Sequence, residues 1–230
     1  MTDFTPRFHS LSNLQPDDLP LIADARAISS PSLRRLDAPE LADVAIVEAF
    51  RADHPNAQAR LFDRYAPYVE RLLIRVMGQD PDIEDLVHDA FLQSFASIHR
   101  LRDAEALKPW LTRIAVNVAR SCIRKRTRSR WLVFLPHERV PEQLDERCDE
   151  AHDLCQRVYA ALGSIRSADD RIAFALRHID GMTLPETAAA CGCSIATAKR
   201  RVRRGRNAFE KAARRDPELA ERFGRVRGAS

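Results

Sequence analysis

The chain has 230 residues, of which 45% are apolar and 30% are charged, and its formal net charge is +4. This length suits one or two small domains, and the apolar content is too high for a disordered chain. The sequence contains no glycine-rich phosphate-binding motif, which argues against a Rossmann or P-loop nucleotide site. The five cysteines are an odd number and do not suit a disulfide framework. Because no apolar run could span a bilayer and the N-terminus lacks a signal peptide, we expect a cytoplasmic protein that binds no membrane.

The first part of the chain, residues 1–40, is punctuated by prolines and shows no lasting helical pattern, which predicts a flexible tail. From about Leu41 the pattern becomes helical. Apolar residues then recur at helical spacing, and they are Leu61, Tyr65, Tyr68, Val69, Leu72 and Val76. Pro67 interrupts this stripe and predicts a kink or a new helix start.

The next helix is expected to begin at Asp80-Pro81, with the aspartate as N-cap and the proline at the first helical position. It is amphipathic. Its apolar side consists of Ile83, Leu86, Val87, Ala90, Phe91 and Phe95. Its other side carries Glu84, Asp85, His88 and Asp89.

A further helix is predicted from about Pro109 to Arg126, inside a basic block (residues 101–135, net charge +7). Opposite its apolar stripe, one face carries Arg113, Asn117, Arg120 and Arg124. Such a face can hold phosphates and contact an exposed base. A solvated polar face is the alternative, and this helix alone does not decide between them.

The second basic block, residues 157–215, has a net charge of +8, and it is separated from the first by an acidic segment, 136–156, with a charge of −5. Two basic blocks suggest two contacts with a polyanion. No alternating pattern predicts a strand. We therefore expect an all-α fold of two small helical domains joined by an acidic linker. The expected boundaries are a tail at 1–40, a domain at 41–130, a linker at 131–156, a domain at 157–215 and a tail at 216–230.

The second block contains a helix-turn-helix pattern. Thr183 and Glu186 form a capping box for its first helix, Gly192 can adopt the positive φ that ends that helix, and Ser194 is a suitable N-cap for the second. We expect Ile195, Ala198, Val202 and Phe209 to face inward on this second helix. The cations expected to face outward are Lys199, Arg200, Arg201, Arg203, Arg204 and Arg206. A basic second helix suits the major groove of DNA.

Four segments, in this order, resemble motifs of the extracytoplasmic-function (ECF) sigma factors of the sigma-70 family. Asp82–Leu92 (DIEDLVHDAFL) resembles the family's D-A-E-D-L-V-Q-E-x-F, and Trp110–Asn117 (WLTRIAVN) resembles W-L-Y-R-I-A-x-N. Ile179–Thr183 and Thr197–Val202 resemble I-D-G-x-S and T-V-K-S-R-L. The resemblance covers residues 45–213. It implies a sigma factor that binds core RNA polymerase and directs promoter-specific initiation at −10 and −35 elements, without a catalytic site or cofactor.

The resemblance also implies roles for individual residues. Core polymerase would be bound, at its beta-prime clamp helices, by Asp82, Asp85, His88 and Asp89. The −10 element, as duplex and melted strand, would be contacted by Arg113, Asn117, Arg120 and Arg124. The −35 element would be contacted by Ser194, Thr197, Lys199, Arg200, Arg203 and Arg204. The segment Arg102–Ala106 would form the loop that captures an unstacked base. The sequence leaves open whether an anti-sigma factor is a further partner.

This chain departs from the family pattern at several places, among them Pro185, which stands in place of a charged residue. The loop before Trp110 lacks the usual glycine and aromatic residue, Arg200 replaces a serine, and Gly205 replaces the alanine of R-A-R. The promoter sequence is therefore not predictable. A stand-alone helix-turn-helix regulator is the alternative function, and a sigma-like module that binds core without opening promoters is a third.

One spacing suits metal ligands. Cys148, His152 and Cys155 would fall on one face of a helix, but no fourth ligand is evident, so we expect no metal site. No arrangement of residues indicates catalysis.

Overall fold

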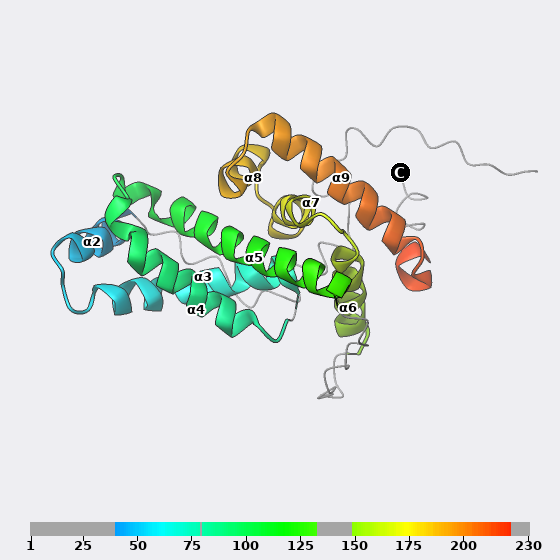
Figure 1. Cartoon of the computed structure of the whole chain (residues 1–230), viewed down its shortest axis with the longest axis horizontal. Helices are drawn as coiled ribbons and strands as arrows, with labels where there is room; N and C mark the ends of the chain where they lie inside the picture. Colours follow the sequence, from blue (N-terminus) through cyan, green and yellow to red (C-terminus); the bar gives the residue numbers. More distant parts are fainter. Residues whose placement is uncertain (1–39, 79, 133–148, 222–230) are drawn as a thin grey trace, which may run out of the picture.

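The computed structural model describes residues 40–78, 80–132 and 149–221, and every regular element within these ranges is helical (Figure 1). The α-helices are α2 (Glu40–Arg51), α3 (Ala57–Met77), α4 (Ile83–Ser97), α5 (Leu107–Leu132), α6 (Asp149–Gly163), α7 (Ala168–Phe174), α8 (Leu184–Cys191) and α9 (Ile195–Ala213). Two short 3-10 turns, η2 (Ile98–Arg100) and η3 (Ala104–Ala106), lie between α4 and α5, and a π-helical segment, η4 (Ala175–Asp180), continues α7. The predicted all-α class is confirmed.

The N-terminal half is a bundle in which α3, α4 and α5 lie against one another and α2 closes one end (Figure 1). The apolar stripe of α3 is buried as predicted, with Leu61 and Val69 fully enclosed. Pro67, however, lies inside one continuous helix rather than at a new start. Pro67 and Asp63, the residue whose carbonyl loses its helical partner, are both exposed, so water can satisfy that carbonyl.

The start of α4 differs from the prediction by two residues. Asp82, not Asp80, is the N-cap residue, and Pro81 lies in the turn before the helix. The Asp80 side chain instead accepts the backbone N–H of Asp82 at 3.0 Å and two N–H groups of Arg126 on α5. Asp80 thus ties the beginning of α4 to α5 rather than capping a helix.

The C-terminal half is built around α7, which packs along α9. Gly205 of α9 makes this close packing possible, because a Cβ at this position would lie 2.5 Å from the Asp170 carbonyl oxygen and 2.7 Å from the Cβ of Phe174. The rings of Phe174 and Phe209 stack beside it with centroids 4.9 Å apart. Gly205, which stands where the family pattern has alanine, therefore lies at a close contact between α7 and α9.

The two halves are not separate bodies: one apolar core runs through both of them. Arg75 of α3 pairs with Asp180 of η4, and Arg171 of α7 donates to the carbonyls of Val76 and Met77 at the end of α3. Gly78, with φ of 86°, ends α3 against the ring of Tyr159 on α6. No sequence pattern predicts this direct packing.

Residues 1–39, 133–148 and 222–230 lie outside the described residues. These ranges include nearly all of the expected N-terminal tail, most of the expected linker and the end of the expected C-terminal tail. The last part of the expected linker, 149–156, is the first half of α6, and Leu154 and Cys155 there are buried. Helical structure is therefore already present in the last part of the expected linker.

We predict that Gly205→Ala destabilises the protein, because the added methyl group meets backbone and Cβ atoms that cannot rotate away. Overpacking of this kind costs about 1–3 kcal/mol in the free energy of unfolding. Thermal unfolding followed by circular dichroism would detect it as a fall in melting temperature of about 2–4 °C for each kcal/mol. The matched control is Gly163→Ala at the end of α6, where no atom lies within 4 Å of the added Cβ. An equal fall in both variants would contradict the prediction.

Candidate nucleic-acid and polymerase interfaces

The helix-turn-helix is formed by α8 and α9, and its caps are those that the sequence predicts. Thr183 and Glu186 make a reciprocal capping box at the start of α8, with the Thr183 N–H donating to Oε2 of Glu186 at 2.7 Å. Gly192 has φ of 63° and ends α8. Ser194 caps α9 by accepting the Thr197 N–H at 3.2 Å. Local hydrogen bonding thus fixes the angle at which α9 leaves the turn.

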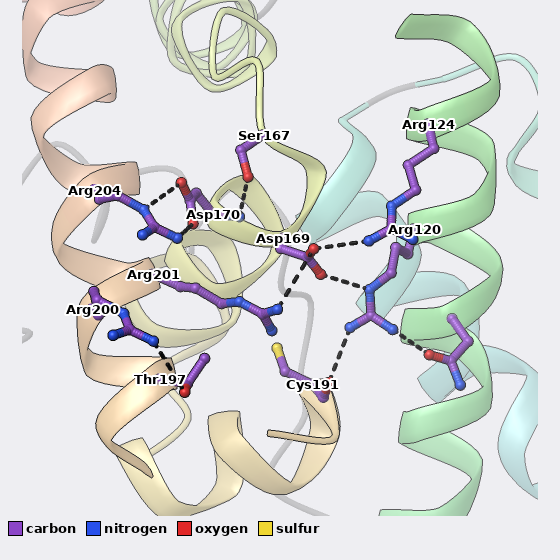
Figure 2. Close-up of polar contacts among 11 residues, drawn as sticks. Arg120, Arg124, Ser167, Asp169, Asp170, Cys191, Thr197, Arg200, Arg201 and Arg204 are labelled. Carbon is purple, nitrogen blue, oxygen red and sulfur yellow. Dashed lines mark hydrogen bonds and ion pairs between the residues drawn. The ribbon is translucent and has the colours of Figure 1, made fainter. Parts of the chain in front are cut away.

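The cations of α9 divide into two groups that the sequence did not separate. Lys199, Arg200 and Arg203 are exposed, as expected of a DNA-binding face. Arg204 is also exposed, with 53% of its side-chain surface accessible, and it makes a bidentate ion pair of 2.8 and 2.9 Å with Asp170 of α7. Arg201 departs from the prediction, because it is largely buried and points toward Asp169 (Figure 2).

Two further predictions for α9 are wrong. Ile195, expected to face inward, is 53% exposed at the start of the helix, where the capped turn has no core above it. Arg206, expected to face outward, is largely buried and pairs with Glu210 one turn later. Ala198 and Phe209 do face the core as predicted, and Val202 is partly buried.

The polar face of α5 carries Arg113, Asn117, Arg120 and Arg124 on one side of the helix, as predicted. This face lies against the C-terminal half. Arg120 donates to Oδ1 of Asp169 at 2.9 Å, to the carbonyl of Cys191 at 3.1 Å and to Asn117 (Figure 2). Arg124 donates to Oδ2 of Asp169 at 2.9 Å. The structure therefore brings the two predicted DNA-binding elements together.

Asp169 lies at the meeting point of these two elements. Burial alone would raise the pKa of its carboxyl group, but Arg201, Arg124 and Arg120 together hold the pKa below its usual value. Sequence reasoning did not single out this residue. Its one signal was an acidic pair in the first turn of a helix, which is also what ordinary helix capping favours.

A second candidate surface lies on α4. Asp85, His88 and Asp89 are all exposed, as predicted, and Asp82 is exposed but pairs with Arg126 at 2.6 Å. The sequence analysis missed two apolar members of this surface. Leu92 is 51% exposed one turn after His88, and Phe62 of α3 is 43% exposed with its ring 4.8 Å from that of Phe91. We call Asp85, His88, Asp89, Leu92 and Phe62 the α4 surface.

The remaining candidate residues have plainer surroundings. Arg102 and Glu105 of the expected melting loop are exposed, and Asp103 caps η3 by accepting the Glu105 N–H. Trp110 packs against the core. Burial raises the pKa of the Cys191 thiol to about 11, which keeps it protonated near neutral pH.

The spacing that suits metal ligands gains no support. Cys148 lies outside the described residues, and His152 is exposed and contacts Gln156, whereas Cys155 is buried. No metal-binding cluster of histidine, cysteine or acidic residues occurs in the part of the chain that the structure describes. Among the described helices, none is long and apolar enough to cross a membrane.

Comparisons with known proteins agree with this geometry. Residues 61–129 match Sigma-70 region 2, and residues 167–209 match Sigma-70, region 4. The chain belongs to the sigma-70 family. The first match contains most of α5 and the α4 surface, and the second contains α8 and most of α9. It is thus a sigma factor, a protein that directs transcription initiation.

Two curated relatives are ECF sigma factors. The ECF RNA polymerase sigma factor SigE of Mycolicibacterium smegmatis is 32% identical over 150 residues, which are 64% of this chain and 57% of the relative. The ECF RNA polymerase sigma-E factor of Escherichia coli is 28% identical over 181 residues, 74% of this chain and 94% of the relative. The chain thus spans little more than half of the first relative and nearly all of the second.

Two solved structures share the fold. The sigma factor RpoE of Bartonella quintana, solved in complex with the anti-sigma factor NepR, has a TM-score of 0.50 and 28% identity, covering 70% of this chain and 99% of its own. CnrH, solved with the cytosolic domain of CnrY, has a TM-score of 0.53 and covers 76% of this chain and 99% of its own. At 22% identity, CnrH supports the fold alone.

We predict that Asp80→Asn lowers the stability at pH 7 and that the loss disappears in acid. Burial opposes ionisation of Asp80, but its bonds with Arg126 and the Asp82 N–H hold its pKa below the ordinary value of 3.8. A carboxyl group with a lowered folded pKa stabilises the fold above its unfolded pKa and loses that contribution as the pH falls through the folded pKa. Urea unfolding should therefore show a deficit of about 2 kcal/mol at pH 7, the order expected for hydrogen bonds to a charged group, that shrinks as the pH falls below 3.8 through the folded pKa of Asp80.

The control for this measurement is Asp89→Asn, which removes an exposed carboxylate of α4 that makes no ion pair among the described residues. Its stability should follow the wild-type curve at every pH. A deficit of Asp80→Asn that stays constant down to pH 2 would contradict the role given to the ion pair.

Proposed function

We propose that this chain binds core RNA polymerase through the α4 surface and places α5 on the −10 element and α9 on the −35 element of a promoter. The observation that carries this proposal is the placing of the two sigma-70 matches. One match contains an acidic, partly apolar exposed surface and a basic helix face, and the other contains a capped helix-turn-helix with an exposed basic face. A stand-alone regulator would need only the second of these.

The α4 surface has the composition of a protein-binding site. Asp85, His88, Asp89 and Leu92 follow one another at helical spacing, so they lie along one side of α4. The carboxylates suit a basic partner and would orient its approach, while Leu92 and Phe62 offer apolar area that a partner would remove from water. The pair of beta-prime clamp helices is the partner that the family resemblance implies.

The exposed face of α9 supports contact with duplex DNA. Lys199, Arg200 and Arg203 leave the helix on its solvent side, and they lie close after the N-terminal end that a recognition helix inserts into the major groove. Ser194 and Thr197 stand at that same end. Because their hydroxyl groups already bond each other at 3.0 Å, we assign them to positioning the helix and to phosphate contact.

The polar face of α5 suits a melted strand. Asn117 and the arginines of this face could hold phosphates and an unstacked base along one side of a helix. We further propose that Arg102–Ala106, which is largely exposed between α4 and α5, lies next to the strand that leaves the duplex. Arg204 stays in our set of −35 contacts, because its side chain is 53% exposed beside the Asp170 ion pair.

This activity rests on binding energy and needs no catalytic group or cofactor. We place it in the cytoplasm, where RNA polymerase acts. The solved complex of RpoE with the anti-sigma factor NepR supports an anti-sigma factor as a further partner of this chain.

We predict that the double variant Asp85→Arg/Asp89→Arg loses binding to core RNA polymerase and that each single variant weakens it. The substitutions reverse the charge of the α4 surface, so a basic partner is repelled instead of attracted. Pull-down of purified core polymerase at physiological salt, followed by transcription from genomic fragments with the reconstituted holoenzyme, measures both steps. The salt concentration is fixed because exposed charges are screened within about 8 Å at 0.15 M.

The control is Asp153→Arg, which makes the same change of charge as each single variant but on α6, away from the α4 surface. It should bind core polymerase like the wild type, because Arg157 keeps Asp216 and Glu218 as partners. Absence of binding by the wild type, with DNA affinity intact, would overturn the proposal in favour of a stand-alone DNA-binding regulator.

A further inference from the structure

Ile195 is the first residue of α9, and 53% of its surface is exposed to solvent. The other exposed large apolar side chains among the described residues are Val44, Phe62 and Leu92, which all belong to the N-terminal half. Ile195 is therefore the only one in the described part of the C-terminal half. A single exposed apolar side chain is common on protein surfaces, so its meaning depends on the groups around it.

The side chains that share this side of α9 are cationic. Ile195, Lys199 and Arg203 follow one another at a spacing of four residues, and all three are exposed. Residues four apart lie about 40° from each other around a helix axis, so the three side chains form one row. Ala198, by contrast, is fully buried. Ile195 thus belongs to the solvent-facing row, and the charge of that row suits a polyanion rather than an apolar partner.

The polar side chains at the start of α9 are engaged within the first turn. Ser194 accepts the Thr197 N–H at 3.2 Å, and its hydroxyl group donates to that of Thr197 at 3.0 Å. Arg200 lies 3.5 Å from the same Thr197 hydroxyl group (Figure 2). Ile195 and Ala196, both exposed, are the side chains of this turn that have no polar group to satisfy.

The chemistry of isoleucine limits what it can recognise on DNA. Its side chain neither donates nor accepts hydrogen bonds, so the one major-groove feature that it suits is the C5 methyl group of thymine. The N-terminal residues of a recognition helix are those that contact base edges. Because the Gly192 turn and the Ser194 cap fix where α9 begins, the Ile195 side chain is presented at a defined position.

We propose that Ile195 selects a thymine in the duplex bound by α9, by packing against the C5 methyl group of that base in the major groove. This inference rests on the proposed function for the assignment of α9 to duplex DNA. It adds a specificity-determining residue to the exposed cations of α9. The cations supply most of the affinity through phosphates and hydrogen bonds, and Ile195 supplies discrimination at one base pair.

The test begins by finding a sequence that the protein binds. Holoenzyme reconstituted from the full chain and purified core polymerase, and the full chain alone, are each offered a library of duplexes with randomised positions. Each thymine of a retained duplex is then replaced in turn by deoxyuridine, which pairs with adenine in the same way and lacks only the methyl group. Fluorescence anisotropy measures the dissociation constants. We expect one replacement to weaken wild-type binding about fourfold, as exposure of one methyl group predicts.

The decisive comparison uses Ile195→Ala. The substitution is at an exposed position, so the fold should be kept, and circular dichroism checks that it is. This variant should bind the thymine duplex and the deoxyuridine duplex equally well at the position identified with the wild type. Val44→Ala is the matched control, because it shortens another exposed β-branched side chain, on α2. It should keep the fourfold difference.

A wild-type affinity that no deoxyuridine replacement changes would overturn the proposal. So would a fourfold difference that persists in Ile195→Ala, since another side chain, such as Ala196, would then contact the methyl group. A library from which neither holoenzyme nor the chain alone retains a sequence would overturn it as well. Failure of the proposed function appears separately, as a chain that does not bind core polymerase yet shows the methyl effect on its own.

Discussion

The arrangement of this molecule depends on the first turn of α7, where Ser167 caps the helix and two carboxylates follow in succession. The Asp170 N–H donates to the Ser167 hydroxyl at 3.2 Å, and this bond fixes the first turn of α7. From this turn the side chains of Asp169 and Asp170 reach different partners (Figure 2). Asp170 holds α9, and Asp169 holds α5. A short helix of ordinary sequence thereby determines where both of the basic helices lie.

The long helix α5 contacts three parts of the molecule. Its apolar stripe, including Leu111 and Ala115, is buried in the N-terminal core. Its arginines meet the C-terminal half, and its last turns reach Asp80 through Arg126. Because one rigid helix connects all three, a change at the interface with α7 is transmitted to the same element that would contact DNA.

Much of the architecture was predictable because it is determined locally. The capping box of α8, the positive φ at Gly192 and the Ser194 cap depend on residues within a few positions of each other, and the structure confirms each one. The apolar stripes of α3 and α4 follow from helical periodicity alone. The overall family could also be recognised because its motifs are linear segments of sequence.

Several of the errors depend on whether a residue far away in the chain makes a contact. Arg201 looked like a surface cation because helical periodicity places it beside exposed neighbours, but Asp169 draws it inward. Ile195 was predicted to be a core residue, and the exposed Leu92 was not noticed. The sequence of a helix does not show whether another element covers a given apolar side chain. Asp80 had the pattern of an N-cap residue, but its carboxylate forms an ion pair with Arg126, which lies 46 residues later in the chain.

The same long-range contacts explain how two strongly basic segments can lie side by side. Residues 101–135 and 157–215 carry net charges of +7 and +8, so their approach is unfavourable unless anions stand between them. Asp169 and Asp180 supply those anions from the C-terminal half, each facing an arginine of the N-terminal half. DNA would supply the same charge in the form of phosphate. Arg120 and Arg124, which we propose contact the −10 element, are therefore engaged by the Asp169 carboxylate in this structure.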